Sequence, residues 1–274
     1  MPRWSCVELV PDDSDPWLLD RLLLSVVAPT TAELRNREAI DRYFFLRYFH
    51  GDFHIRFRLR LTSHGSEAFV NRTVVGAAAR AGVVCRAGVY EPELTKYGGP
   101  EGLDVAEQYF TASSAFALDC LDRTVGSLPQ RLMIAMQAFQ ALLLAGGLDV
   151  GSRARLLASY GDYWRKVAQR IHGSAPVSSR PDNQTISWLR AFTGPPSRLR
   201  DFVGEAVGSG LDEWCEAVNR DVPALRALAS SGRLTTASEH VLGHLAHTFH
   251  NRLGLGVVHE TIIADHLLAA CEGP

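Results

Sequence analysis

The sequence has few cysteines, and none of them form a recognisable pair. Its 274 residues include five cysteines, with no C-x-x-C spacing among them. An odd, scattered set argues against a disulfide framework and against a structural zinc site, and it suits a reducing compartment. The cysteines are Cys6, Cys85, Cys120, Cys215 and Cys271.

The sequence also lacks a charge excess and a long apolar run. The formal net charge is -2, with no basic or acidic block, so bulk electrostatics do not support a nucleic-acid or membrane-surface role. The start of the chain is polar and acidic where a signal peptide would be apolar. The longest apolar run, residues 132–148, is interrupted by Gln137 and Gln140 and is too short to span a bilayer. These absences predict a soluble cytoplasmic protein.

Several common catalytic and cofactor motifs are missing as well. There is no G-x-S-x-G elbow, no H-E-x-x-H pair, and no G-x-G-x-x-G or Walker loop. Nucleophilic catalysis by serine or cysteine therefore has little support, and nucleotide cofactors have none. We expect a protein that uses no metal and no organic cofactor.

The order of the elements predicts the fold class. A chain of this length, 46% hydrophobic, can bury a core as one large domain or two small ones. Strands are expected early and helices late, which is typical of an α+β fold, and we predict a single large domain over residues 1–274 with a mainly antiparallel sheet packed against helices. The predicted strands cover residues 4–10, 43–48, 52–61 and 83–90. The predicted helices cover residues 17–27 (ended by Pro29), 66–81, 103–121, 128–144, 152–171, 211–229, 235–253 and 257–270, and residues 172–200 are predicted to be a long loop or lid.

One strand carries a row of arginines. Residues 52–61 alternate polar and apolar side chains, and a strand turns successive side chains to opposite faces. One face then holds His54, Arg56, Arg58 and Arg60, and the other holds Ile55, Phe57, Leu59 and Leu61. A fixed row of guanidinium groups is suited to binding carboxylates. The alternative is a solvated sheet face whose arginines only keep the protein soluble.

A histidine stripe follows near the end of the chain. His240, His244, His247 and Asn251 recur at the spacing that places side chains on one face of a helix. Two histidines four residues apart can bind zinc, but no cysteine or aspartate nearby completes a site. Proton transfer by a histidine is the favoured interpretation, because its usual pKa near 6.5 lets it act as acid or base. Histidines that simply face solvent remain the alternative.

The loop from Tyr90 to Pro100 is rich in proline and glycine, and shaped loops of this kind often carry function. Glu93 and Lys96 could pair and brace the turn, or Lys96 could add a cation to the arginine row. Together, arginines, a cationic loop and a proton-carrying histidine predict a site for an anionic substrate that loses a proton and expels a leaving group.

Three segments resemble the C-terminal domain of lantibiotic dehydratases, which also occurs as a free-standing thiopeptide-type bacteriocin biosynthesis protein. They fall in the family's order along the chain. The first joins residues 43–48 to residues 54–58, the second joins residues 90–93 to residues 96–99 and 106–107, and the third covers residues 247–253.

The resemblance implies a lyase reaction. In that family the domain takes a peptide whose serine or threonine carries a glutamyl ester, removes the Cα proton and expels glutamate, leaving dehydroalanine or dehydrobutyrine. By position, Arg56 and Arg58 match the arginines that engage the glutamyl group, and His247 matches the catalytic histidine. Lys96 stands where the family usually has arginine, and we expect it to act with them. Further substrate contacts are expected from His54, Arg60, Glu93, Asn251 and Arg252.

Two other functions stay open at this point. The family's other branch joins two dehydroalanines of a thiopeptide precursor in a formal 4+2 cycloaddition, with loss of the leader peptide, to give a pyridine or related ring. A non-catalytic leader-peptide-binding module is the third interpretation. The expected partners are a precursor peptide, with leader and core, and a separate glutamyl-tRNA-dependent glutamylation protein. No nucleic acid or membrane partner is expected, a homodimer stays open, and residues 172–200 are expected to cover the bound peptide.

Overall fold

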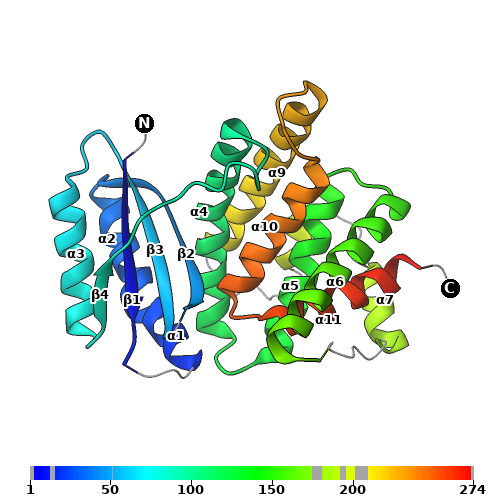
Figure 1. The fold of residues 1–274 in the computed structure, drawn as a ribbon, viewed down its shortest axis with the longest axis horizontal. Helices are drawn as coiled ribbons and strands as arrows, with labels where there is room; N and C mark the ends of the chain where they lie inside the picture. The colour runs from blue at the N-terminus through cyan, green and yellow to red at the C-terminus, as the bar shows by residue number, and fades with distance from the viewer. Residues whose placement is uncertain are drawn as a thin grey trace.

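The computed structural model describes residues 3–12, 16–50, 52–174, 181–191, 196–200 and 209–272. Strands and short helices come first, and a larger set of long helices follows (Figure 1). The first part contains β1 (Trp4–Val10), α1 (Pro16–Leu22), the π-helical η1 (Leu23–Val27), α2 (Ala28–Asn36), β2 (Ile40–His50), β3 (Asp52–Leu61), α3 (Glu67–Arg80) and β4 (Val84–Ala87). The second part contains α4 (Pro100–Arg123), α5 (Leu128–Ala145), α6 (Val150–His172), α7 (Asn183–Ala191), the 3-10 helix η2 (Pro196–Leu199), α9 (Ser209–Ser230), α10 (Ser238–Arg252) and α11 (Val257–Cys271). The α+β prediction is confirmed.

The four strands form one antiparallel sheet in the order β2-β3-β1-β4. β2 and β3 are the predicted hairpin, with Ile40 opposite Leu61 at one end. From Ile55 to Leu61 of β3 the apolar side chains are buried and the arginines are half-buried, so the alternation predicted for this part of the strand is confirmed, whereas His54 on the arginine face is buried. The sheet therefore presents one apolar face and one arginine face.

Helices cover the two faces of the sheet unequally. α1, η1, α2 and α3 pack on the apolar face and share one core with it (Figure 1). On the other side of the molecule, α4 and α10 contact β2, the edge strand. The loop between β4 and α4 crosses the arginine face on its way to the helices (Figure 1). The arginine face is thus left partly open between the sheet, this loop and α10.

Two local predictions in the first part are wrong. Pro29 does not end a helix: α1, η1 and α2 follow one another without a break, and Pro29 lies in the first turn of α2, directly after the π-helical η1. The fourth strand is shorter than predicted, because only Val84–Ala87 pairs with β1 and the chain then leaves the sheet.

The segment 172–200 is not a structureless loop where the structure describes it. Asn183–Ala191 forms α7, which packs against α11 and buries Ile186 and Leu189. Gln140 of α5 donates from Nε2 to the carbonyl oxygen of Leu189, at 2.9 Å. α7 lies at the end of the molecule away from the sheet (Figure 1). Residues 175–180 and 192–195 of the predicted lid lie outside the described residues.

The position of α10 is fixed from two sides. Asn251 bonds to both backbone groups of Arg47 on the free edge of β2, accepting from N and donating to O at 2.9 Å each. The buried carboxylate of Asp20 pairs with Arg47 and with Arg131, at 2.5 Å each. The same two guanidiniums donate to the carbonyl oxygens of Arg252 and Leu253, at 3.1 Å each, and so bind the C-terminal end of α10.

All five cysteines are free thiols. Among the described helices, none combines the length and the apolar character that crossing a bilayer requires.

Candidate active site

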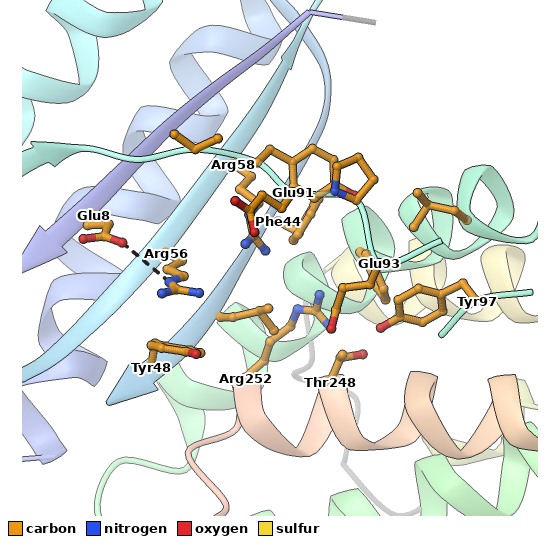
Figure 2. A pocket seen from close by; sticks show the side chains of 16 residues that line it. Glu8, Phe44, Tyr48, Arg56, Arg58, Glu91, Glu93, Tyr97, Thr248 and Arg252 are labelled. Atoms are coloured by element: carbon orange, nitrogen blue, oxygen red, sulfur yellow. Dashed lines mark ion pairs between the residues drawn. The ribbon is translucent and has the colours of Figure 1, made fainter. Parts of the chain in front are cut away.

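A cavity of about 550 Å³ lies where the arginine face of the sheet meets α4 and α10 (Figure 2). The sheet, the loop after β4 and the two helices each supply part of its wall. The lining residues are Glu8 of β1; Phe44, Leu46 and Tyr48 of β2; Arg56 and Arg58 of β3; Val89, Tyr90, Glu91, Pro92, Glu93 and Tyr97 of the loop; Leu103 and Phe110 of α4; and Thr248 and Arg252 of α10. Residues from both ends of the chain therefore meet here.

The sheet wall of the cavity carries two arginines with different surroundings. Arg56 pairs weakly with Glu8, Nε to Oε1 at 3.5 Å, and its guanidinium lies 3.5 Å from the ring centroid of Tyr48. Arg58 contacts no carboxylate among the described residues; its guanidinium lies over the rings of Phe44 and Tyr90, at 5.3 and 5.0 Å. Burial lowers the pKa of Arg58, and the neighbouring charge of Arg56 lowers it further. Among the described residues Arg58 thus forms no ion pair, although the charge of Glu93 raises its pKa.

The helix wall carries a third guanidinium, that of Arg252. This side chain is 0% exposed, and none of its three nitrogens has a hydrogen-bond partner among the residues that the structure describes. Its guanidinium carbon lies 5.0 Å from the ring centroid of Phe110. Burial is the main cause that lowers the pKa of Arg252, to about 10, and the charge of Arg58 acts in the same direction.

The cavity also contains acidic groups, so its wall is of mixed charge. Glu8, Glu91 and Glu93 line it together with the three arginines. A zwitterionic ligand could be held by such a wall, with carboxylates on guanidiniums and an ammonium group on carboxylates. Tyr90 stays protonated, because burial and its hydrogen bond to Glu107 raise its pKa far above the usual value.

Lys96 pairs with Glu93, as one of the two predictions for this loop states. Its Nζ lies 3.3 Å from Oε2 of Glu93, and it is not among the residues that line the cavity. Its neighbour Tyr97 takes that place. The structure thus favours the first of the two interpretations, in which Lys96 and Glu93 brace the turn, and a role of Lys96 in the arginine row stays a prediction.

His247 is held by a buried carboxylate on α11. Its Nδ1 lies 2.8 Å from Oε1 of Glu260, and its ring stacks on Trp164, with centroids 4.3 Å apart. Burial alone would raise the pKa of Glu260, but the imidazoles of His250 and His247 lower it to about 2. An ionised carboxylate accepts a hydrogen bond from Nδ1–H of His247, which leaves Nε2 of the ring free to take a proton.

His247 is only partly buried, and its ring does not line the cavity. Its side chain is 25% exposed and belongs to the predicted stripe, in which His240 is exposed and His244 is half-buried. The stripe reaches the cavity at Tyr97, whose ring centroid lies 6.1 Å from that of His244. That His247 shares one site with the arginines thus stays a prediction.

The first two histidines of the stripe bond to each other. Nε2 of His244 and Nε2 of His240 are 2.9 Å apart. Burial lowers the pKa of His244 to about 3, and the charges of Lys96, His240 and His247 add to this. In the part of the chain that the structure describes, no three His, Cys, Asp or Glu side chains gather as metal ligands.

Three residues predicted to contact substrate have structural partners instead. His54 is buried beside Asp52 and outside the cavity wall. Arg60 forms a two-fold pair with Asp41, at 2.7 and 2.6 Å, and lines another depression of the surface. Asn251 has both amide groups bound to the β2 backbone. The partners of Arg60 and Asn251 come from β2, and that of His54 lies two residues away on β3, so none of the three side chains lines the cavity. Their contact with substrate stays a prediction.

A comparison with models of protein families identifies the family of this chain. The family model described as "Lantibiotic biosynthesis dehydratase C-term" matches residues 4–271. The chain belongs to this family. Its members are lantibiotic-biosynthesis proteins, so the predicted resemblance is confirmed over nearly the whole chain. A search of curated proteins gave no significant match.

Solved structures share the fold of this dehydratase C-terminal domain. The structure of TsrL covers 99% of the chain and 94% of its own, with 20% identity and a TM-score of 0.69. The tRNA-dependent lantibiotic dehydratase MibB from Microbispora sp. 107891 covers 97% of the chain with 28% of its own length, at 23% identity and a TM-score of 0.71. The pyridine synthase TbtD from thiomuracin biosynthesis covers 98% and 97%, at 17% identity and a TM-score of 0.65.

Sequence reasoning missed several groups of this dehydratase-family site. Glu260, Trp164 and Tyr160 assemble around His247 only because α6, α10 and α11 pack together. One signal was available: a glutamate inside the apolar run of α11 is a residue type that is rarely buried unless paired. For Glu8 and Thr248 the sequence offers no comparable signal.

Proposed function

We propose that this protein eliminates glutamate from a glutamylated serine or threonine of a precursor peptide. The observation that carries the proposal is Arg58, a half-buried guanidinium on a cavity wall that pairs with no carboxylate of the described residues, next to Arg56. These guanidiniums favour a ligand that carries a carboxylate, and two dehydroalanine side chains, which are neutral, offer them no charge to bind. Family membership supports the same reaction.

The reaction needs a base and a stabilised leaving group. The Cα proton moves to the base, the Cα–H electron pair becomes the new double bond to Cβ, and the Cβ–O bond breaks with its electrons leaving on the glutamate carboxylate. Nε2 of His247 is the proposed base, because Glu260 holds the proton on Nδ1. Fixed cations at Arg56 and Arg58 would stabilise the negative charge that develops.

A glutamyl adduct also fits the mixed charge of the wall. Esterification uses one carboxyl group of glutamate, so the adduct keeps one carboxylate and one ammonium group. Arg56 and Arg58 can donate hydrogen bonds to the carboxylate of the adduct. Glu91, which lines the cavity from the loop, can accept hydrogen bonds from its ammonium group. The expected partners remain the precursor peptide and a separate glutamylating protein.

Cycloaddition is the second candidate, and Lys96 favours it. Where the family usually has arginine, this lysine is turned to Glu93 and contributes no cation to the cavity. A chain that lacks one of the residues used for glutamate elimination would be expected in the branch of the family that joins two dehydroalanines.

Mass spectrometry separates these functions. The protein is given a peptide with one glutamylated serine and, separately, a leader-bearing peptide with two dehydroalanines. We expect loss of glutamate from the first and no change in the second. Conversion of the second alone would replace our proposal by cycloaddition, and tight leader binding without change in either peptide would favour a binding module.

A further inference from the structure

Glu260 accepts three hydrogen bonds in the helical part of the molecule, and only one of them comes from His247. The residue is 1% exposed. Its Oε1 lies 2.8 Å from Nδ1 of His247. Its Oε2 lies 2.5 Å from the hydroxyl oxygen of Tyr160 and 2.6 Å from Nδ1 of His250. Among the described residues, no lysine or arginine pairs with this carboxylate, so these three donors have to compensate its charge.

Tyr160 reaches Glu260 because α6 and α11 pack closely (Figure 1). Gly161 lies where the two helices meet, and a Cβ atom there would come within 3.2 Å of that of Ala264. The Tyr160 ring packs on Phe139, with centroids 5.1 Å apart. Burial and the charge of Glu260 raise the pKa of Tyr160 well above its usual value, so its hydroxyl group donates to the carboxylate.

The two imidazoles on Glu260 differ at their second nitrogen. An ionised carboxylate can only accept, so both rings carry a proton on Nδ1. His250 is 0% exposed, and its Nε2 has no hydrogen-bond partner in the described part of the chain. A proton on this nitrogen would bury an unpaired cationic donor, which costs more than an unpaired acceptor. The side chain of His247 is 25% exposed, so of the two rings it is the one that can take a second proton.

We propose that Tyr160 and His250 are positioning residues that hold this carboxylate ionised and directed at His247, and weaken its attraction for the protons on that ring. Each hydrogen bond that they donate compensates part of the negative charge of Glu260. Without them the carboxylate would bind the imidazolium form of His247 more tightly and leave less of the neutral base. The inference rests on the proposed function, in which Nε2 of His247 removes the Cα proton, and deepens it.

Other titratable groups lie near this cluster on the elements packed around it. On α10, His244 precedes His247 by about one turn, and burial lowers its pKa to about 3, so it is neutral near pH 7. The charge of Lys96, from the loop before α4, also acts on His244. On α11, burial lowers the pKa of His259, and the charge of Glu260 opposes this. The variants below leave all of these groups in place.

NMR titration of the His247 ring tests the proposal without turnover. The signal of this ring is identified by its absence from the spectrum of His247→Gln. We expect Tyr160→Phe, which removes only a hydroxyl group, to shift the titration midpoint upward by roughly 0.5–1 pH unit, because one hydrogen bond to the carboxylate is lost. The control Tyr163→Phe makes the same change at an exposed position of α6 and should leave the midpoint unchanged.

Two variants of His250 separate hydrogen bonding from packing. Asparagine and leucine have nearly the same size and leave the same space when they replace the ring, but only the amide nitrogen of asparagine can donate to Glu260. We expect His250→Leu to shift the His247 midpoint upward as Tyr160→Phe does, and His250→Asn to keep the wild-type midpoint. Equal shifts in the two variants would show that His250 acts by packing alone and would overturn its positioning role.

Kinetics on a glutamylated peptide connect this titration with turnover. In Tyr160→Phe and His250→Leu the acid limb of the kcat/KM profile should move with the NMR midpoint, which slows elimination roughly 3- to 10-fold on that limb and keeps the plateau at higher pH. If wild type eliminates glutamate but neither variant moves the midpoint, the positioning role is wrong and the proposed function stands. If both variants move the midpoint but wild type does not eliminate glutamate, the hydrogen-bonding role of Tyr160 and His250 stands and the proposed function is wrong.

Discussion

Arg58 and Arg60 lie two residues apart on one face of β3, yet their surroundings differ completely. Arg60 binds both carboxylate oxygens of Asp41, whereas Arg58 lies against Phe44 and Tyr90. The N–H groups of a paired guanidinium already donate to a carboxylate, whereas those of an unpaired one can donate to a ligand. The two positions therefore form a matched pair for testing whether the arginines of the cavity bind the substrate.

The first prediction concerns this pair. We expect Arg58→Gln to lower kcat/KM for elimination of glutamate from a glutamylated peptide by about 10- to 100-fold, because a charged hydrogen bond to the adduct is lost. Rates are followed by mass spectrometry. Arg60→Gln should keep kcat/KM, and a loss at Arg60 as large as that at Arg58 would contradict the assignment.

A second residue-scale prediction concerns Glu260. In Glu260→Gln the amide can donate to Nδ1 of His247, which favours the proton on Nε2 and removes the proposed base. We expect kcat for elimination to fall by roughly 10² or more, with KM little changed, since positioned proton transfer contributes about 10²–10⁴-fold. Steady-state kinetics over a range of pH values measure both parameters.

Glu213→Gln is the control for that experiment, because Glu213 pairs with Arg35 on the surface of the protein. It should leave kcat and its pH profile as in wild type. If Glu260→Gln unfolded less easily than wild type and kept its full kcat, His247 would not depend on this carboxylate.

At the scale of elements, Asn251 joins α10 to the free edge of β2. Its amide replaces the neighbouring strand that an edge strand lacks. We expect Asn251→Ala to lower the free energy of unfolding by about 1–3 kcal/mol, because two half-buried backbone groups of Arg47 lose their partner. Urea unfolding measures the change. If Asn251→Ala kept the stability of wild type but lost turnover, Asn251 would contact the substrate instead.

The histidine stripe of α10 gives a pH-dependent prediction. The pKa of His244 falls from 6.5 to about 3 on folding, chiefly through burial. Between these values the unfolded chain binds a proton that the folded chain does not, so stability is lost as the pH falls from 6.5 toward 3. We expect His244→Gln to lose less stability than wild type over this range, as measured by urea midpoints.

His172→Gln, at the exposed end of α6, provides the comparison. It should follow the wild-type curve. A His244→Gln curve parallel to that of wild type would show that the buried imidazole does not cause the acid sensitivity.

At the scale of the molecule, patterns with a local cause could be predicted from the sequence. The alternation in residues 52–61 is set by strand geometry, and the faces of β3 follow from it. The family motifs indicated Arg56, Arg58, Glu93 and Arg252, all of which line one cavity.

What could not be predicted depends on partners far away in the sequence. Arg60 is neutralised by Asp41, and Asn251 is bound by Arg47. No periodicity reports such pairings, because they exist only once sheet and helices have packed. The same holds for Glu260, whose role needs α10 and α11 side by side.

The cavity walls come from opposite ends of the chain, with β1–β3 on one side and the end of α10 on the other. Recombination between relatives is therefore constrained. A chimera that inherits its sheet from one parent and its helices from another would bring together guanidiniums shaped for different ligands. Exchange of specificity should succeed only when the hairpin and α10 are inherited together, with Asp20 and Arg131 to hold them in register.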